Sequence, residues 1–95
     1  MDKLLILFTM EGCPFCSMMK EKLNESNINF YERDIDIHKD EYELFVDITK
    51  NEMVPAFMII EADDDKQPKT LLFAPERDFN ELDEGLEIIK NNLLL

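Results

Sequence analysis

Two cysteines separated by two residues, in the segment Cys13-Pro14-Phe15-Cys16, are the side chains of this sequence best suited to chemistry. The 95-residue chain contains no other cysteine. A Cys-x-x-Cys pair beside a strand-helix-strand pattern is typical of a thiol redox site and not of a disulfide framework. Because a thiolate, and not a thiol, attacks a disulfide, such a site must lower the pKa of one of its cysteines.

The two cysteines are expected to have different roles because they occupy different positions at the start of a helix. Cys13 is predicted at the N-cap, where its sulfur can accept hydrogen bonds from the amides of Phe15 or Cys16 near the positive end of the helix dipole. Cys16 lies one turn inside and is predicted to point toward the core. We therefore expect Cys13 to be the nucleophile and Cys16 the resolving thiol. Pro14 and Phe15 restrict the loop and offer a substrate an apolar surface.

The elements that position this motif are predicted from the pattern of apolar residues. Strands are expected at residues 3–9, 28–36, 56–60 and 70–73, and helices at 13 to about 27, at 40–50 and from 78 onward. The first crossover joins parallel strands, and the last two strands form an antiparallel hairpin. The order is βαβαββα, which is a thioredoxin-like α/β fold with a four-stranded mixed sheet and three helices, in a single domain over residues 1–95.

Each predicted helix turns one apolar face toward the sheet. Asp40 and Asp78 are the predicted N-caps of the second and third helices, and His38 is assigned to a loop. The charged segment 63–68 is predicted to be a solvated hairpin turn, because it lacks the ligand spacing of a calcium loop. The expected core positions of the helices are Cys16, Met19 (or Lys20) and Leu23, then Tyr42, Phe45 and Ile48 or Thr49, then Phe79, Leu82, Leu86, Ile89 and Leu93.

The composition of the chain limits the partners and the cell compartment that we expect. The chain has 22 acidic and 10 basic residues and a formal net charge of -12, so nucleic acid and anionic membranes are not expected as partners. We interpret the acidic surplus as solvated carboxylates, with a specific basic partner as the alternative. The apolar stretch 4–8 is far shorter than the roughly 20 residues of a membrane span. With no signal-peptide pattern at its start, the protein is expected to be a cytoplasmic monomer.

Taken together, these features resemble a glutaredoxin. The resemblance rests on the strand before Cys13, on a cysteine motif close to the family's Cys-Pro-Tyr-Cys, on the Val54-Pro55 pair and on Asp78. It implies that the Pro55 peptide bond is cis, that Pro55 faces Cys13, and that the Val54 backbone pairs with glutathione or a protein substrate. It also implies glutathione as co-substrate and no bound cofactor. The implied contacts to glutathione or a protein substrate are Pro14, Phe15, Val54, Pro55, Arg77 and Asp78.

The chain departs from the family's pattern at several positions that surround glutathione. Met10 replaces a lysine that many glutaredoxins have, and Met53 replaces a threonine. These changes remove two attractive contacts for an anionic ligand. Glu52 also stands where a basic or neutral residue is usual, and Ala74-Pro75 replaces a Gly-Gly pair. The residues that could compensate are Arg77, Lys50 and Lys69.

The leading functional hypothesis is a dithiol oxidoreductase that reduces protein or glutathione mixed disulfides and so takes part in electron transport and cell redox homeostasis. One alternative is a thioredoxin-type or redoxin-type electron donor that is reduced by a flavoprotein reductase and not by glutathione. Another is a redox-inert interaction module. A zinc site is disfavoured, since zinc needs about four ligands and His38 is the only histidine.

Overall fold

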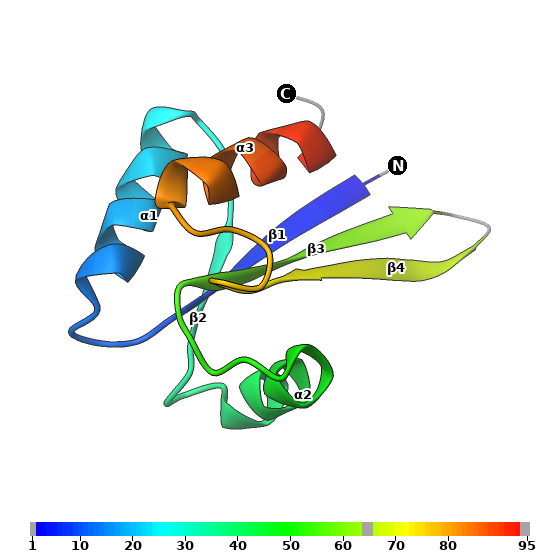
Figure 1. Ribbon diagram of the computed structural model, residues 1–95. Coiled ribbons are helices and arrows are strands. Elements are labelled where there is room, and N and C mark those ends of the chain that lie inside the picture. Colours follow the sequence, from blue (N-terminus) through cyan, green and yellow to red (C-terminus); the bar gives the residue numbers. More distant parts are fainter. Residues whose placement is uncertain (1, 64–65, 94–95) are drawn as a thin grey trace.

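A four-stranded mixed sheet with helices on both faces forms the core of the chain (Figure 1). The computed structural model describes residues 2–63 and 66–93. Its strand order is β2-β1-β3-β4, with β1 parallel to β2 and antiparallel to β3, and with β3 antiparallel to β4. The predicted thioredoxin-like α/β fold is therefore confirmed. The elements are β1 (Asp2–Thr9), α1 (Pro14–Glu25), β2 (Tyr31–Asp34), α2 (Lys39–Thr49), β3 (Ala56–Asp63), β4 (Lys66–Phe73) and α3 (Leu82–Leu93).

The central strand β1 explains how the two layers of helices are held. Helices α1 and α3 lie on one face of the sheet and α2 lies on the other (Figure 1). Because successive strand side chains point to opposite faces, Leu5 and Leu7 join the apolar cluster under α1 and α3, while Ile6 and Phe8 join the cluster around Phe45 of α2. The continuous apolar run is thus buried on both faces, as expected of a covered strand.

Strand β2 is shorter than predicted. It covers only Tyr31–Asp34, because the residues on either side have other hydrogen-bond partners. Before the strand, the Ile28 amide donates to the Leu23 carbonyl at 2.9 Å and closes the end of α1. After it, the Asp34 side chain accepts from the Asp36 amide at 2.8 Å and starts a turn. Of the apolar side chains that suggested a longer strand, Ile28 is buried, and Phe30 and Ile35 are half-buried.

The hairpin of β3 and β4 is longer than predicted. Its ladder runs from Phe57↔Phe73 to Glu61↔Lys69 and, after a bulge, to Asp63↔Lys66. Most of the segment expected as a turn is therefore strand, because pairing satisfies its backbone groups. Residues 64 and 65 of that segment lie outside the described part of the chain.

Both predicted aspartate caps are wrong. The N-cap of α2 is His38, whose side chain makes no capping hydrogen bond, and Asp40 lies inside the first turn, where the helix dipole favours an acid. Helix α3 begins at Leu82, and Asp78 lies in the loop before it. Several predicted core positions are confirmed. On α1, Met19 is buried and not Lys20, and on α2, Thr49 is buried and not Ile48. Phe45 and Ile89 are buried as expected.

Candidate functional site

The cysteine pair sits at the N-terminus of α1 as a Cys13–Cys16 disulfide, with the two Cα atoms 5.2 Å apart. Cys13 is the N-cap residue, with an extended backbone, and its sulfur accepts a hydrogen bond from the Cys16 amide at 3.1 Å. Of the two amides named in the prediction, Cys16 is therefore the donor. Cys13 is half-buried, whereas Cys16 is 2% exposed. Cys13 is therefore the cysteine that a substrate can reach more easily.

Local sequence explains how the motif reaches this position. Strand β1 ends at Thr9, and the chain then turns through Gly12, whose φ of 78° is a conformation that favours glycine. The Cys13 amide donates to the Met10 carbonyl at 3.3 Å and closes this turn. Pro14 occupies the first turn of α1, where its missing N–H costs nothing. The strand end, the turn and the helix start together fix the Cys13 sulfur at the helix terminus.

A groove of about 400 Å³ lies beside α1, and we call it the Phe15 groove because Phe15, between the two cysteines in the sequence, lines it while neither cysteine does. Three segments line it: the start of α1, the segment before β3, and the loop between β4 and α3. Its lining residues are Phe15, Met18, Lys22, Met53, Val54, Pro55, Pro75, Glu76, Phe79, Asn80, Glu81, Leu82 and Asp83. Three of the predicted site residues, Phe15, Val54 and Pro55, thus meet in one groove, and the Val54–Pro55 peptide bond is cis.

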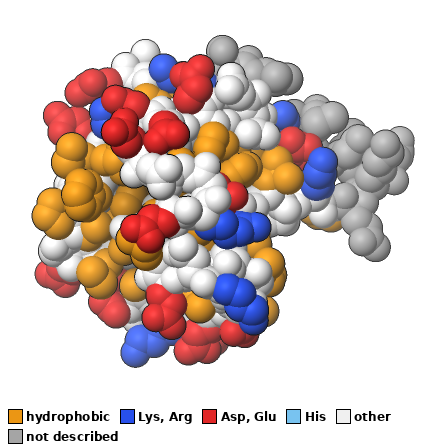
Figure 2. All heavy atoms as spheres, viewed as in Figure 1, with side chains coloured by type: hydrophobic (Ala, Val, Ile, Leu, Met, Phe, Trp, Pro, Cys, Tyr) orange, Lys and Arg blue, Asp and Glu red, His pale blue; other side chains and the backbone are white. Residues whose placement is uncertain are grey.

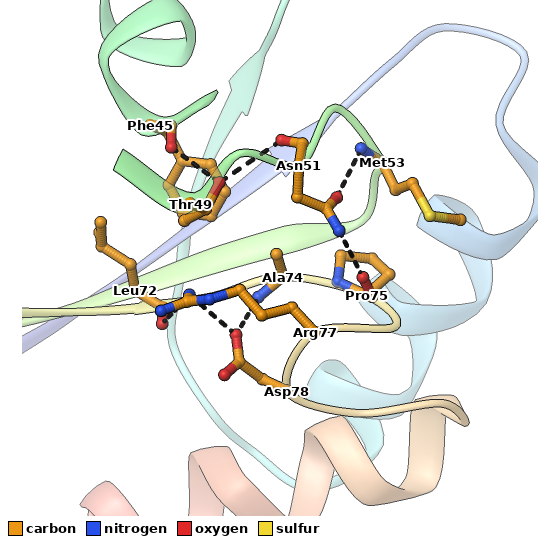
Figure 3. A network of polar contacts seen from close by, with 9 residues as sticks. All are labelled: Phe45, Thr49, Asn51, Met53, Leu72, Ala74, Pro75, Arg77 and Asp78. Atoms are coloured by element: carbon orange, nitrogen blue, oxygen red, sulfur yellow. Dashed lines mark hydrogen bonds and ion pairs between the residues drawn. The ribbon is translucent and has the colours of Figure 1, made fainter. Parts of the chain in front are cut away.

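Arg77 and Asp78 lie in the same loop but do not line the Phe15 groove. The Asp78 carboxylate accepts from the Ala74 amide at 2.8 Å and from the Arg77 guanidinium at 3.1 Å (Figure 3). The guanidinium also donates to the Leu72 carbonyl at 3.4 Å. These contacts hold the loop to the end of β4. Neither Lys50 nor Lys69, the other basic residues considered for a ligand carboxylate, lines the groove.

Comparison with protein families matches residues 5–63 to the family described as Glutaredoxin. The match covers more than half of the 95 residues. The chain belongs to the glutaredoxin family. No curated protein sequence matches it significantly. Membership of this family and a disulfide at Cys-x-x-Cys spacing support a thiol oxidoreductase in general.

The part of the chain that matches the glutaredoxin family contains only some of the site. It includes Cys13, Cys16, Val54 and Pro55, and it ends at β3. The loop between β4 and α3, which forms one wall of the Phe15 groove, lies beyond the match.

Asn51 is a site residue that the sequence analysis missed. Its amide nitrogen donates to the Pro75 carbonyl at 2.7 Å, and its amide oxygen accepts from the Met53 amide at 2.8 Å (Figure 3). The first bond reaches the loop after β4, and the second holds the segment that leads to Val54. An asparagine bonded to the backbone two residues later is a recognisable turn signal, but its contact with Pro75 is not visible in the sequence.

A second hollow, of about 310 Å³, reaches Cys16 from β1 and β2 and is polar. Within it, the Glu32 carboxylate accepts from the Thr9 hydroxyl at 2.7 Å and from the Lys20 ammonium at 2.9 Å. These two hydrogen bonds, Thr9 first, hold the pKa of Glu32 below its usual value. Glu11 and Met10 also line this hollow and not the Phe15 groove.

In residues 2–63 and 66–93, no group of three or more His, Cys, Asp or Glu side chains is placed to hold a metal ion. Among the helices of this described part of the chain, none has the length and apolar character needed to cross a membrane.

Proposed function

We propose that the chain is a thiol-disulfide oxidoreductase in which Cys13 is the nucleophile and Cys16 the resolving thiol. This proposal rests on the different burial of the two disulfide-bonded cysteines. Cys13 caps α1 and is half-buried, while Cys16 is buried one turn further on. The amide that donates to the Cys13 sulfur stabilises a thiolate more than a thiol, as does the helix dipole.

The reaction is a two-step exchange. In the first step, the Cys13 thiolate attacks one sulfur of a substrate disulfide, forms a mixed disulfide and releases the other sulfur as a thiolate, which takes a proton from solvent. In the second step, the Cys16 thiol loses its proton and attacks the Cys13 sulfur, which releases the remaining substrate thiolate. The substrate gains two electrons and two protons, and the protein is left with the Cys13–Cys16 disulfide.

The substrates we propose are disulfides of proteins and mixed disulfides with glutathione. Val54 and Pro55 line the groove directly before β3, and we assign to the Val54 backbone the pairing with an extended segment of the substrate. Phe15, which is 60% exposed, supplies an apolar surface, and Pro14 is exposed at the same helix start. No cofactor takes part in this exchange.

A thiol donor must then return two electrons to the Cys13–Cys16 disulfide. Glutathione is the donor that the family suggests, and a flavoprotein reductase is the alternative. The ion pairs of the basic side chains favour the flavoprotein reductase as donor. Arg77 is bound to Asp78, and Lys22, in the groove, is bound to Asp83 at 2.7 Å. Each of these positive charges already has an acidic neighbour, which weakens its attraction for the carboxylates of glutathione.

The proposal is tested by replacing each cysteine with serine and measuring disulfide reduction. Cys13→Ser is expected to abolish reduction of protein disulfides and of glutathione mixed disulfides, because the attacking sulfur is lost. Cys16→Ser should abolish reduction of protein disulfides, since the mixed disulfide is not resolved. Activity retained by Cys13→Ser would refute the role of Cys13. A comparison of turnover with glutathione and turnover with a thioredoxin reductase then identifies the electron donor.

A further inference from the structure

We propose that the Phe15 groove binds a basic segment of a protein substrate that also carries an apolar side chain next to its disulfide. This inference rests on the proposed exchange at Cys13 and specifies the substrate class of that site. It also changes the interpretation of the acidic surplus, because at this groove the negative charge would recognise a partner.

The floor of the groove is apolar. Phe15 and Met18 come from α1, Met53 from the segment before β3, and Phe79 and Leu82 from the far wall. Phe15, Met18 and Met53 are large apolar side chains that are at least 42% exposed. Methionine side chains adapt to ligands of different shape, so this floor suits an apolar side chain of a protein segment.

The charged residues of the groove are mostly acidic. In the described residues that line it, Lys22 is the single basic side chain, against Glu76, Glu81 and Asp83. Lys22 and Asp83 form an ion pair at 2.7 Å, and this contact raises the pKa of Lys22. Within the described part of the chain, neither Glu76 nor Glu81 forms an ion pair through its side chain. Among the described residues, these two acidic residues of the lining are therefore not neutralised by a basic side chain.

The loop that forms the far wall of the groove turns at Glu76. Its φ is 67°, a left-handed conformation, and its amide donates to the Phe79 carbonyl at 2.7 Å. This turn places Glu76 between Pro75 and Phe79, which also line the groove.

The surface around the groove has the same character. Figure 2 shows hydrophobic side chains gathered over the first half of α1 and acidic side chains over the start of α3 beside them. A substrate with lysine or arginine next to its cysteine would gain an attraction here that anionic glutathione would not. The long-range field of a chain with net charge -12 would also speed the approach of a basic partner.

The test uses two synthetic peptides with an intramolecular disulfide, identical except that the residue beside the first cysteine is lysine in one and glutamate in the other. Both carry a leucine on the other side of that cysteine. Rates of reduction by the full-length protein are measured at low salt and at high salt, together with the rate for glutathione disulfide. The variants are Glu76→Gln, Glu81→Gln and the double variant. Glu43→Gln is the control, because Glu43 is exposed on α2, across the sheet.

At low salt, the lysine peptide is expected to react about 10-fold faster than the glutamate peptide, and also faster than glutathione disulfide. The reason is that Glu76 and Glu81 attract the lysine of one peptide and repel the glutamate of the other. Each single variant should lower this preference by about 1.5- to 5-fold, high salt should remove most of it, and the control should leave it unchanged. Equal rates for the two peptides, or a preference that survives in the double variant, would overturn the inference and leave the exchange at Cys13 standing. Failure to reduce either peptide would instead refute the proposed function, and the inference with it.

Discussion

The two walls of the Phe15 groove are built in different ways. The α1 wall is set by neighbouring residues: Gly12 turns the chain, Cys13 caps the helix and Phe15 follows directly. The far wall, the loop between β4 and α3, is held by bonds within the loop, such as that from the Ala74 amide to Asp78, and also by the bond from the distant Asn51 to Pro75. The comparison indicates that the α1 wall is encoded locally, whereas the position of the far wall also depends on a tertiary contact.

Removing the Asp78 carboxylate should have the largest effect on stability and should separate the two walls. Asp78→Ala leaves the Ala74 amide and the Arg77 guanidinium without their acceptor, and hydrogen bonds to charged groups contribute about 1.5 to 3 kcal/mol. We expect a loss of this size in urea unfolding, with an unchanged rate of alkylation of reduced Cys13. A matched Arg77→Gln variant should lose less than about 1 kcal/mol, because the Arg77 side chain is 44% exposed. A large fall in the alkylation rate of Asp78→Ala would show that the walls are not independent.

Asn51→Ala should weaken the connection between the two loops. The variant loses the bonds to Pro75 and Met53, at a cost of about 1 to 2 kcal/mol. Because these bonds place the segment before Val54 against the far wall, KM for a disulfide peptide should rise several-fold while kcat changes little.

Asn51→Asp offers a finer comparison with Asn51→Ala. It keeps the acceptor for Met53 but places a carboxylate oxygen against the Pro75 carbonyl, so its KM should be at least as high as that of Asn51→Ala. Asn29→Ala, at an exposed position, is the control. If kcat fell and KM stayed constant, Asn51 would not act by positioning the groove.

The smallest expected effect concerns the polar hollow on the other side of Cys16. The pKa of Glu32 is lowered from 4.5 by Thr9 and Lys20, so this carboxylate stabilises the fold above its unfolded pKa, and the contribution is lost as pH falls through the folded pKa. At neutral pH, Glu32→Gln should cost about 0.5 kcal/mol, since the side chain is 41% exposed and well screened. At a pH below the folded pKa of Glu32, urea unfolding should find the difference much reduced. A difference that grows on acidification would contradict this assignment.

The sequence predicted the α1 wall well because each of its determinants is local. The strand, turn and helix that carry Cys13 follow from apolar pattern, glycine and proline, and the roles expected of the two cysteines agree with their burial. The order of all seven elements was also predictable, since long apolar segments separate clearly in this chain.

The far wall was not predictable to the same degree. Asp78 has the residue type and spacing of a helix cap, but the Ala74 amide captures its carboxylate, and α3 starts four residues later at Leu82. The left-handed backbone of Glu76 and the bond from Asn51 to Pro75 are likewise products of the folded loop. Residue type and spacing do not specify which of several available partners a polar side chain takes once the chain is folded.

In the proposed mechanism, Cys13, and not Cys16, attacks the substrate disulfide and carries the mixed disulfide. The most direct test of this claim is to incubate the reduced Cys16→Ser variant with an excess of a disulfide peptide and to locate the product by mass spectrometry. We expect a stable mixed disulfide between Cys13 and the peptide, formed rapidly because the Cys13 sulfur is accessible and bound to the Cys16 amide in the wild-type chain. No adduct on Cys13, or an equally fast adduct on Cys16 in the Cys13→Ser variant, would contradict the account.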